Sequence, residues 1–371
     1  MKKTKVRKRV GIICFLDGYA NSNKPTEIFK HLKDSSDVVF INTINIFRLT
    51  TKNQQIIEAD SPLFDLPRIL LFILEKLKLV PFSTIGLKSI YSWLFLLELQ
   101  LRAKVVAKVV NDLNLDLVIG ESPVDSLVFL EQLSGKTLYD CATPLADELY
   151  FGNKITKKFY DELLRLEINV YKKVDYLSFH WEVYNWYVKE HHYQGKNMIV
   201  LSGGCSDVPV VSKYNSPPRI VYFGYLGGYW INLPLLSRLS KIYPHIDVYG
   251  SPKPDEKYEL NYKGYAKPEV LKDYQFGLIT LSDDILRREG FSAKHLEYLS
   301  FGLPVLLPKW RKNSDYFEGT LTYDEDNFLA QIKKYSDKKN WESIHQMALS
   351  QAKKFRWSEV LKPLDEIVEN S

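Results

Sequence analysis

The sequence predicts an α/β protein made of two doubly wound parallel sheets, and three observations support this fold class. The chain has 371 residues, 45% of them hydrophobic and 26% charged, which is long enough for two domains that each bury a core. Short apolar runs alternate with helical patterns along the chain, as expected for parallel sheets covered by helices. The alternation pauses once, at Pro217 and Pro218, and then starts again.

The first half of the chain provides the elements of one sheet. Residues 10–16 are an apolar run that ends at Asp17 and Gly18, so they are expected to form the first strand. A signal peptide would need a longer apolar core followed by a cleavage site of small residues. The remaining elements are strands at 38–41, 115–119, 136–139, 176–179 and 198–201, and helices at 27–32, 68–113, 125–133 and 157–173.

The second half repeats this pattern after a linker. Residues 211–218 are expected to be extended, because the two prolines stop regular structure. The elements that follow are strands at 219–223, 246–249, 260–263, 276–280 and 304–307, helices at 233–242, 268–272, 292–301 and 327–335, and an amphipathic stretch at 341–368. The predicted domains are residues 1–210 and 219–352, with 353–371 as a C-terminal helix.

Charge and cysteine content exclude several functional classes. The 50 Lys and Arg residues exceed the 45 Asp and Glu residues by five, which is too mild an excess for a protein dedicated to nucleic acid. The three scattered cysteines form neither a disulfide framework nor a zinc-binding pair. No run reaches the ~18 uncharged apolar residues that span a bilayer. We expect a cytoplasmic protein, or one peripheral on the inner face of the cell membrane, with no nucleic-acid partner and no metal.

Residues 63–101 allow two interpretations. The segment is rich in Leu, Ile, Phe and Trp but is interrupted by charges, so it fits two or three amphipathic helices packed on the sheet. Alternatively, Phe82, Tyr91 and Trp93 enter a membrane interface while lysine side chains reach up to the headgroups. The second interpretation makes an anionic membrane surface a partner, and the six basic residues before Val10 would strengthen it.

The most informative stretch, residues 279–308, reads as strand, loop, helix, turn and strand. Within it Glu289 and Glu297 bracket seven residues. Gly290 permits close backbone approach, and Ser292 is an expected helix N-cap. The free N–H groups of a helix that begins there form a site for a diphosphate.

The spacing of these groups matches a nucleotide-sugar, in which a diphosphate lies between a sugar and a ribose. Glu289 stands at the beginning of the helix and Glu297 further along it, so each carboxylate would accept hydrogen bonds from the hydroxyls of one of the two polyols. Lys294 shares the helical face of Glu297 and would neutralise phosphate charge.

Polar residues also follow the strands of the first predicted sheet. Asp17, Gly18, Glu121, Asp140 and His180 each lie at the end of an expected strand. Ligands of doubly wound sheets gather at the carboxyl ends of the strands, so these residues are expected to face one site. Asp140 either takes part in the chemistry there or merely caps the following segment.

The ordered string resembles the GT-B glycosyltransferases, particularly family 4 and its relatives, the retaining E-x7-E group that includes enzymes of bacterial polysaccharide synthesis. The residues that carry the resemblance are Glu289-Gly290-Phe291, Lys294, Glu297 and Gly302-Leu303-Pro304-Val305. Residues 219–228, 262–281 and 353–367 extend it more weakly. It implies two Rossmann-like domains that face a cleft, with the C-terminal helix crossing back to the first domain.

The resemblance also implies an activity and residue roles. The chain would move a sugar from a UDP- or GDP-sugar to a glycan or polyprenyl-linked acceptor in cell-surface polysaccharide biosynthesis, with retention and without a metal or other cofactor. Glu289 and Asp140 would be catalytic, although relatives carry His-Asp where this chain has Tyr139-Asp140. The donor-binding residues would be Gly18, Gly227, Gly228, Gly290, Phe291, Ser292, Lys294 and Glu297. The acceptor side would comprise Asp17, Glu121 and His180.

The chain departs from these relatives in one further respect. Many of them carry Arg and Lys after the glycine turn of the second domain, whereas residues 224–230 contain neither. Two alternatives therefore stay open: a nucleotide-sugar-binding or scaffold protein without catalysis, and a nucleotide-sugar epimerase.

Overall fold

The computed structural model describes residues 7–14, 24–43, 56–59, 85–208, 210–290, 292–311 and 316–371. The chain divides into two compact units, Met1–Ser202 together with Leu361–Ser371, and Gly203–Val360. It therefore leaves the first unit once and returns to it with its last residues. Residues 211–218, the expected linker, are anchored within the second unit, where the backbone N–H of Ser212 donates to the carbonyl of Phe301 at 2.8 Å.

Among the described residues of the first unit, six parallel strands form one sheet: β1 (Arg9–Cys14), β2 (Asp37–Asn42), β3 (Ile56–Glu58), β4 (Leu117–Gly120), β5 (Lys136–Cys141) and β6 (Tyr176–Phe179). Their order is β3-β2-β1-β4-β5-β6. Val10, Ile12 and Ile13 of β1 have no exposed surface, as expected for a strand covered on both faces. The strand order reverses between β1 and β4, and such a reversal is where doubly wound sheets bind ligands.

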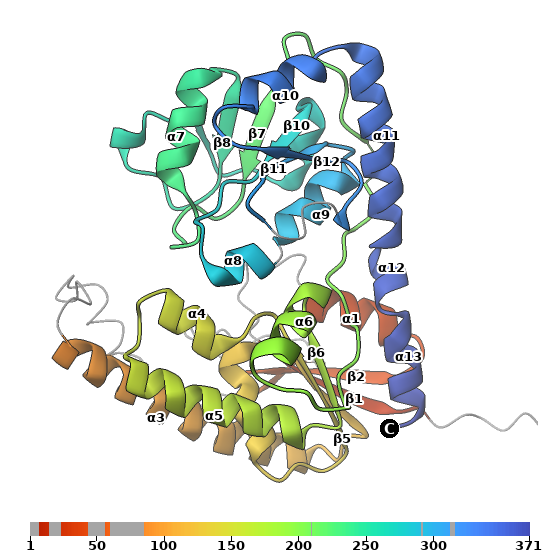
Figure 1. The fold of residues 1–371 in the computed structure, drawn as a ribbon. Coiled ribbons are helices and arrows are strands. Elements are labelled where there is room, and N and C mark those ends of the chain that lie inside the picture. Colours follow the sequence, from red (N-terminus) through yellow and green to blue (C-terminus); the bar gives the residue numbers. More distant parts are fainter. Residues whose placement is uncertain are drawn as a thin grey trace, which may run out of the picture. The chain divides into compact units, whose positions relative to one another are not determined.

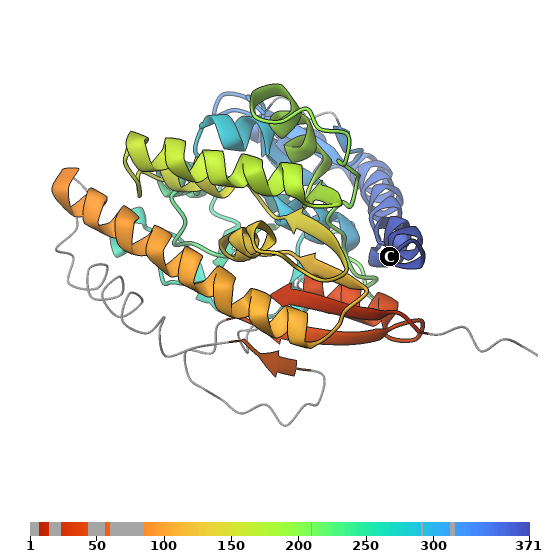
Figure 2. The ribbon, with the colours of Figure 1, turned by 90° about the horizontal axis from the view of Figure 1, so that it is seen from below.

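The helices of the first unit are α1 (Lys24–Leu32), α3 (Ile85–Asp112), η2 (Pro123–Leu130), α4 (Leu145–Phe151), α5 (Lys157–Lys173), α6 (Glu182–His191) and α13 (Lys362–Glu369). Figures 1 and 2 show α3 and α5 on one side of the sheet and α1 and α6 on the other. His31 Nε2 in α1 lies 2.9 Å from Asp365 Oδ1 in α13. This contact attaches the C-terminal helix to the first unit.

The second unit also contains six parallel strands among its described residues: β7 (Ile220–Phe223), β8 (Ile246–Tyr249), β9 (Tyr262–Gly264), β10 (Phe276–Leu278), β11 (Val305–Pro308) and β12 (Thr320–Tyr323). Their order is β12-β11-β10-β7-β8-β9, so the reversal lies between β7 and β10. Ile220, Val248, Phe276 and Leu306 from four of these strands are fully buried in one core.

The described helices of the second unit are α7 (Leu233–Ile242), η3 (Glu256–Tyr258), η4 (Pro268–Asp273), α8 (Ile285–Glu289), α9 (Ala293–Ser300), α10 (Phe328–Lys334), α11 (Lys338–Lys354) and α12 (Trp357–Val360). Helix α9 packs against β10 and β11, and α11 packs against α9. The element that carries the sequence motif is therefore held between the sheet and a long outer helix.

The predicted α/β class with two parallel sheets is confirmed, although some elements differ in kind. The expected helices at 125–133 and 268–272 are the 3-10 helices η2 and η4, each of which begins at a proline. Several short elements were not predicted, because their sequences lack a clear hydrophobic periodicity. They are strands β3 and β12 and helices α4, α6 and α8.

The strand expected at 198–201 is wrong. Only an isolated bridge between Met198 and Leu177 forms there. Beyond it, side chains replace the strand ladder: Asn185 donates to the carbonyl of Ile199 at 2.8 Å. The backbone of this segment is thus satisfied without a seventh strand.

Of the apolar segment 63–101, residues 63–84 lie outside the described residues, and Phe82 is among them. The remainder belongs to the single helix α3. Tyr91 is buried in it, whereas Ile90 and Trp93 are exposed by about half of their surface. In the described part of the chain no helix has the length and apolar character needed to span a bilayer, and contact of this segment with a membrane remains a prediction.

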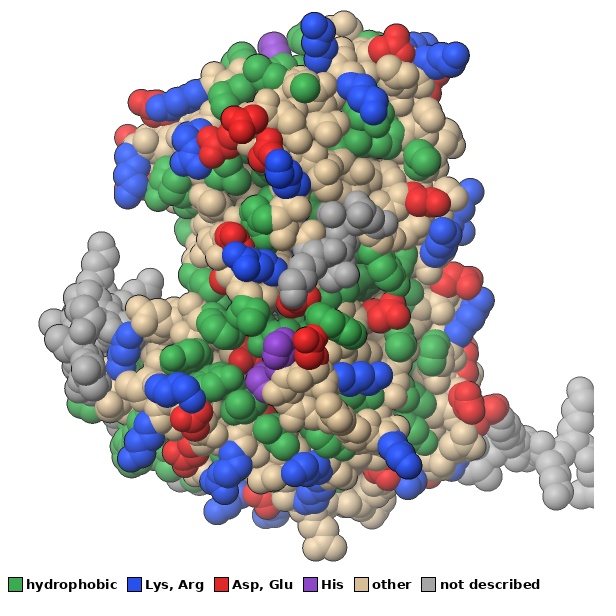
Figure 3. Space-filling view, in the orientation of Figure 1, with side chains coloured by type: hydrophobic (Ala, Val, Ile, Leu, Met, Phe, Trp, Pro, Cys, Tyr) green, Lys and Arg blue, Asp and Glu red, His purple; other side chains and the backbone are tan. Residues whose placement is uncertain are grey.

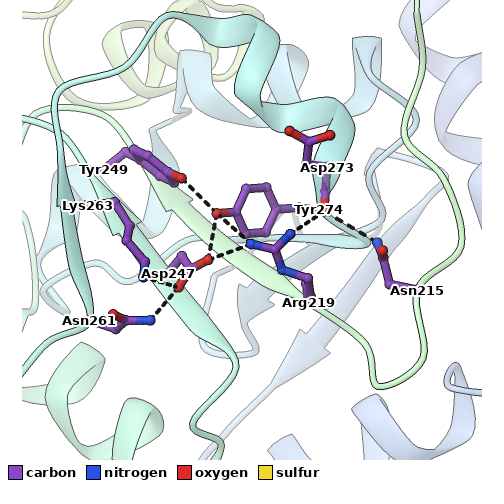
Figure 4. Close-up of polar contacts among 8 residues, drawn as sticks. All are labelled: Asn215, Arg219, Asp247, Tyr249, Asn261, Lys263, Asp273 and Tyr274. Carbon is purple, nitrogen blue, oxygen red and sulfur yellow. Dashed lines mark hydrogen bonds and ion pairs between the residues drawn. The ribbon is translucent and has the colours of Figure 1, made fainter.

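A polar network fixes one side of the second sheet (Figure 4). The buried carboxylate of Asp247 in β8 accepts from Arg219 at 2.9 Å and from the hydroxyl of Tyr274 at 2.7 Å. Its other oxygen accepts from Asn261, which precedes β9. The network joins the starts of β7, β8, β9 and β10, and its donors and acceptors satisfy one another, as buried polar groups require. We assign it to the fold.

Candidate functional site

Helix α9 begins where the sequence indicates, with Ser292 as its N-cap residue. The φ and ψ angles of Ser292 are −109° and 121°, but its hydroxyl does not accept a hydrogen bond from the helix. The N–H of His295 donates to the carbonyl of Ser292 at 2.8 Å, whereas the N–H groups before it have no acceptor within the helix, which makes this helix end suited to an anion. Phe291, the preceding candidate, lies outside the described residues.

Lys294 lies in the first turn of α9 and is held by an aromatic residue of the sheet. Its Nζ donates to the hydroxyl of Tyr222 in β7 at 2.7 Å and lies 4.3 Å from the centre of the same ring. Burial lowers the pKa of Lys294 to about 8, although nearby Glu297 works in the opposite direction. Its hydrogen-bond partner is a neutral phenol, so at neutral pH the ammonium group is mostly protonated and can attract an anionic ligand.

Two glycine turns shape the space beside this ammonium group. Gly224 follows β7 with a φ of +134°, and a Cβ atom there would lie 2.3 Å from the Cε of Lys294. Gly250 follows β8 with a φ of +148°, and its Cβ would meet the carbonyl oxygen of Gly224 at 1.8 Å. Sequence reasoning emphasised Gly227 and Gly228, whereas Gly224 and Gly250 are the glycines beside Lys294 whose positive φ favours glycine.

Glu297 lies one turn further along α9 and is half-buried. Burial raises its pKa to about 7, and Lys294 counteracts that rise. The next residue, Tyr298, fixes the helix to the sheet, since its hydroxyl accepts from the N–H of Phe223 at 2.8 Å. Its ring lies so close to Gly277 that a Cβ there would be 2.3 Å away. The helix face that carries Lys294 and Glu297 is therefore fixed relative to the end of β7.

Glu289 and Gly290 lie at the end of α8. Glu289 is buried, with 2% of its surface exposed. The carbonyl of Gly290 accepts from Nη2 of Arg311, which is buried as well. The φ of Gly290 is −74°, a value open to any residue, so its backbone conformation does not demand glycine. Sequence reasoning missed Arg311, for which the available signal was a single arginine just beyond an apolar strand.

Three of the strand-end candidates come together in the first unit. Glu121 follows β4, Asp140 lies in β5 and His180 follows β6, and these strands are neighbours in the sheet. The Nδ1 atom of His180 lies 3.8 Å from Oε1 of Glu121. Asp17 and Gly18, the other candidates of this group, lie outside the described residues.

Lys24, the first residue of α1, completes this group and was not foreseen. Its Nζ lies 2.6 Å from Oδ2 of Asp140 and also donates to the carbonyl of Leu201. Neither side chain of the Lys24–Asp140 pair has any exposed surface. A buried charge is costly unless it is paired, so the pair holds α1 at the end of β5. The signal in the sequence was a lysine directly before Pro25 in an otherwise ordinary helix start.

Burial shifts the titration of this group. It raises the pKa of Glu121 to about 7, with the charge of Asp140 adding to the rise and Lys24 opposing it. It also lowers the pKa of His180 to about 3, with Lys24 adding to the fall. At neutral pH the imidazole is therefore uncharged, and Glu121 is close to its titration midpoint. Perturbed groups of this kind at strand ends are typical of functional sites.

A second buried ion-pair group supports the same sheet edge and was also missed. Arg102 in α3 donates to Glu98 in the same helix and to Asp125 in η2, the latter at 3.3 Å. Thr43 donates to Asp125 at 3.1 Å. These contacts attach α3 and η2 to the end of β2.

The predicted residues thus form two sets, one in each unit: Glu121, Asp140 and His180 in the first, and Gly227, Gly228, Glu289, Gly290, Ser292, Lys294 and Glu297 in the second. Among the described residues no three His, Cys, Asp or Glu side chains are grouped so that they would hold a metal ion. On the face shown in Figure 3, basic and acidic side chains are interspersed. This face carries no extended basic surface of the kind that binds nucleic acid.

The two parallel sheets with their strand orders, and a C-terminal helix that belongs to the first unit, define the GT-B fold, and that fold prediction is confirmed. Over 98% of its length the chain is similar to three solved structures, which it covers almost completely. Sucrose-phosphate synthase from Thermosynechococcus elongatus has a TM-score of 0.70 at 12% identity, with 99% of that chain covered.

The lipopolysaccharide outer core galactosyltransferase WaaB in its apo form has a TM-score of 0.60 at 9% identity, with 99% of that chain covered. The calicheamicin glycosyltransferase CalG4 has a TM-score of 0.57 at 10% identity, with 98% of that chain covered. No protein-family model matches the chain, and no curated protein is significantly similar in sequence. At these identities the likeness concerns the fold.

Proposed function

We propose that the chain is a glycosyltransferase that moves a sugar from a nucleotide-sugar to a hydroxyl of a glycan or a lipid-linked oligosaccharide. The observation that carries the proposal is the arrangement on α9. An uncapped helix start and the ammonium group of Lys294 offer a diphosphate site, and the carboxylate of Glu297 lies one turn further along. This order of groups corresponds to phosphates followed by a ribose.

The neighbours of the fold support the same class of reaction. Two of the three solved structures are named as a glycosyltransferase and a galactosyltransferase, and the third is a synthase of sucrose phosphate. The chain matches them over nearly its whole length, so both domains of the fold are present. This supports the assignment of the donor to one domain and the acceptor to the other. The name of the lipopolysaccharide outer core galactosyltransferase also supports a place for this chain in cell-surface polysaccharide biosynthesis. We further propose that the chain acts in the cytoplasm or on the inner face of the cell membrane.

On the donor side, the protein would act on the departing diphosphate. The bond between the anomeric carbon and the phosphate oxygen breaks, and its electron pair leaves with the nucleoside diphosphate. The α9 N–H groups and Lys294 stabilise the charge that develops there, which is usually the largest electrostatic contribution to catalysis. Because Glu289 is buried, only a sugar that reaches the interior of the site would contact its carboxylate.

On the acceptor side, the acceptor oxygen forms the new bond to the anomeric carbon and passes its proton to the departing phosphate oxygen. This route gives retention, needs no metal or other cofactor, and follows from the resemblance of the E-x7-E string to retaining enzymes. Asp140 has no exposed surface, so it would act indirectly, through the buried ion pair that it forms with Lys24. UDP- and GDP-sugars are the proposed donors.

The test begins with the donor. A bound nucleotide-sugar raises thermal stability by mass action, so a screen against UDP-, GDP-, ADP- and CMP-sugars is expected to show one clear stabiliser. Glu289→Ala should then lose sugar transfer but keep nucleotide binding, and Glu297→Ala should weaken nucleotide binding. Glu342→Ala, an exposed position on α11, is the control. Full activity in both site variants would contradict the assignment.

A non-catalytic nucleotide-sugar-binding protein is the second candidate, favoured by the absence of Arg and Lys from residues 224–230. Tight binding of the donor without transfer to a crude lipid-linked acceptor would support it. Conversion of the donor alone into an isomer would instead identify an epimerase.

A further inference from the structure

Glu121 and His180 are the accessible members of the polar group at the strand ends of the first unit. Of the four residues gathered at the ends of β4, β5 and β6, Lys24 and Asp140 are fully buried, whereas 17% of the Glu121 side chain and 29% of the His180 side chain are exposed. The first two therefore support the site from within, and the last two form its accessible surface.

The charges at this surface are suited to hydroxyl groups and not to phosphate. Lys24 is occupied by Asp140 and by the carbonyl of Leu201, and Arg102 is occupied by Glu98 and Asp125. The accessible pair then consists of a carboxylate and a neutral imidazole. A carboxylate accepts hydrogen bonds from hydroxyls, and an imidazole both donates and accepts. A phosphate would meet like charge.

We propose that Glu121 determines acceptor specificity by binding the hydroxyls of an uncharged sugar, and that the buried Lys24–Asp140 pair at the neighbouring strand end is the positioning element of this site. This inference rests on the proposed function, since it names the substrate class of the acceptor side. It extends that function by assigning a role to Lys24, which was not among the residues predicted from the sequence.

The ionisation of Glu121 supports this role. Its pKa is raised to about 7 by burial, by Asp140 and by Asp125, while Lys24 lowers it. Among the described residues, Cys14 of β1 and His180 are further titratable groups close to it. Both are neutral at pH 7, because burial raises the pKa of Cys14 and lowers that of His180. Binding of hydroxyls by the carboxylate should therefore increase as the pH rises through 7.

The experiment uses the full chain and neutral methyl glycosides of glucose, galactose and N-acetylglucosamine, with binding followed by saturation-transfer NMR from pH 5.5 to 8.5. At least one glycoside is expected to bind, more tightly above pH 7, while glucose 1-phosphate should bind at least tenfold more weakly. Glu121→Gln should weaken binding about tenfold and remove the pH dependence. Glu162→Gln, at a partly exposed position on α5, is the matched control and should change nothing.

The supporting pair is tested by opposite shifts of the pH midpoint. Asp140→Asn removes a like charge and should move the midpoint to lower pH, whereas Lys24→Met removes a cation and should move it to higher pH. Lys24→Arg should restore the original midpoint. If Lys24→Met does not fold, Asp140→Asn and the Lys24→Met/Asp140→Asn double variant take its place.

Three results would overturn the inference. Glycoside binding could be unchanged in Glu121→Gln, or no neutral glycoside could bind. The third is a pH midpoint that does not move when Lys24 or Asp140 is replaced. Thermal stabilisation by nucleotide-sugars reports on the second unit separately. If glycosides bind as expected while no nucleotide-sugar binds, the proposed function fails and the hydroxyl-binding role of Glu121 stands. If the protein turns over the donor and Glu121→Gln transfers sugar normally, the proposed function stands and the role of Glu121 fails.

Discussion

The two units hold their key cations in opposite ways. In the second unit, the ammonium group of Lys294 lies against a phenol, and its charge has no carboxylate within hydrogen-bond distance among its described contacts. In the first unit, Lys24 is 2.6 Å from the carboxylate of Asp140, and Arg102 is shared by two carboxylates. A cation with a neutral partner can still attract an anion, whereas a paired one cannot. This difference is the basis for proposing a diphosphate ligand in the second unit and hydroxyl ligands in the first.

The strongest test of this contrast is to break the buried pair of the first unit. Lys24→Met leaves Asp140 buried without its cation, and breaking such pairs costs ~3–5 kcal/mol of unfolding free energy. The double variant Lys24→Met/Asp140→Asn removes both charges and should recover most of the loss. Urea unfolding of the three proteins measures both effects. A loss below about 1 kcal/mol in Lys24→Met would show that the pair behaves like a surface ion pair.

The corresponding substitution in the second unit should affect binding more than stability. Lys294→Met removes the cation proposed to meet the diphosphate, and we expect nucleotide affinity to fall by ~10–100-fold, the value of a charged hydrogen bond. Since the pKa of Lys294 is about 8, affinity in the unmodified protein should also decrease as the pH rises through 8, when the ammonium group loses its proton. Calorimetric titration with the stabilising nucleotide measures both.

Lys333→Met, an exposed position on α10, is the control for this substitution and should leave affinity and its pH dependence unchanged. A pH response that persists in Lys294→Met would assign the titration to another group. The opposite pH responses expected for the two units, a rise through 7 for hydroxyls and a fall through 8 for the nucleotide, would confirm that they carry separate binding groups.

The position of Lys294 depends on shape, which a glycine substitution can test. Gly224→Ala places a methyl group at 2.3 Å from the Cε of Lys294 and forces alanine to a φ of +134°. We expect a loss of about 1–3 kcal/mol from backbone strain and weaker nucleotide binding because the lysine is displaced. Gly264→Ala is the matched control, since Gly264 also has a positive φ but nothing lies within 4 Å of its Cβ position. Gly264→Ala should lose stability but bind the nucleotide as tightly as the unmodified protein.

The fold and helix α9 were predictable because they depend on local patterns. The repeated alternation gave both parallel sheets, and the serine and glycine spacing gave the start of α9. Lys24, Arg102 and Arg311 could not be found in this way, since each acts on a partner far away in the chain. The burial of Glu289 and Asp140 was equally hidden, because the sequence places a residue at a strand or helix end without showing what covers it. Contacts between distant residues arise only when the sheets assemble.

The smallest expected effect compares one histidine from each unit. In the first unit, His192 Nε2 lies 2.8 Å from Oδ2 of the buried Asp147. Burial opposes the charged imidazole, but the bond to Asp147 outweighs it, and the pKa of His192 is raised. In the second unit, burial and Arg311 lower the pKa of His295 to about 3, and its partner is the neutral hydroxyl of Thr320 at 2.8 Å.

These shifts predict opposite contributions to stability. A raised pKa adds stability below the unfolded value near 6.5 that is lost as the pH rises through the folded value. His192→Asn should therefore remove about 1 kcal/mol of unfolding free energy at pH 6 and much less at pH 9. His295 is neutral across that range, and its lowered pKa costs stability only as the pH falls below 6.5, so His295→Asn should show no such decline toward pH 9. The exposed His191→Asn is the control for its neighbour. Equal pH profiles for His192→Asn and His191→Asn would mean that Asp147 does not hold a charged imidazole, and the contrast between charge-paired and neutral contacts would then be confined to the two lysine sites.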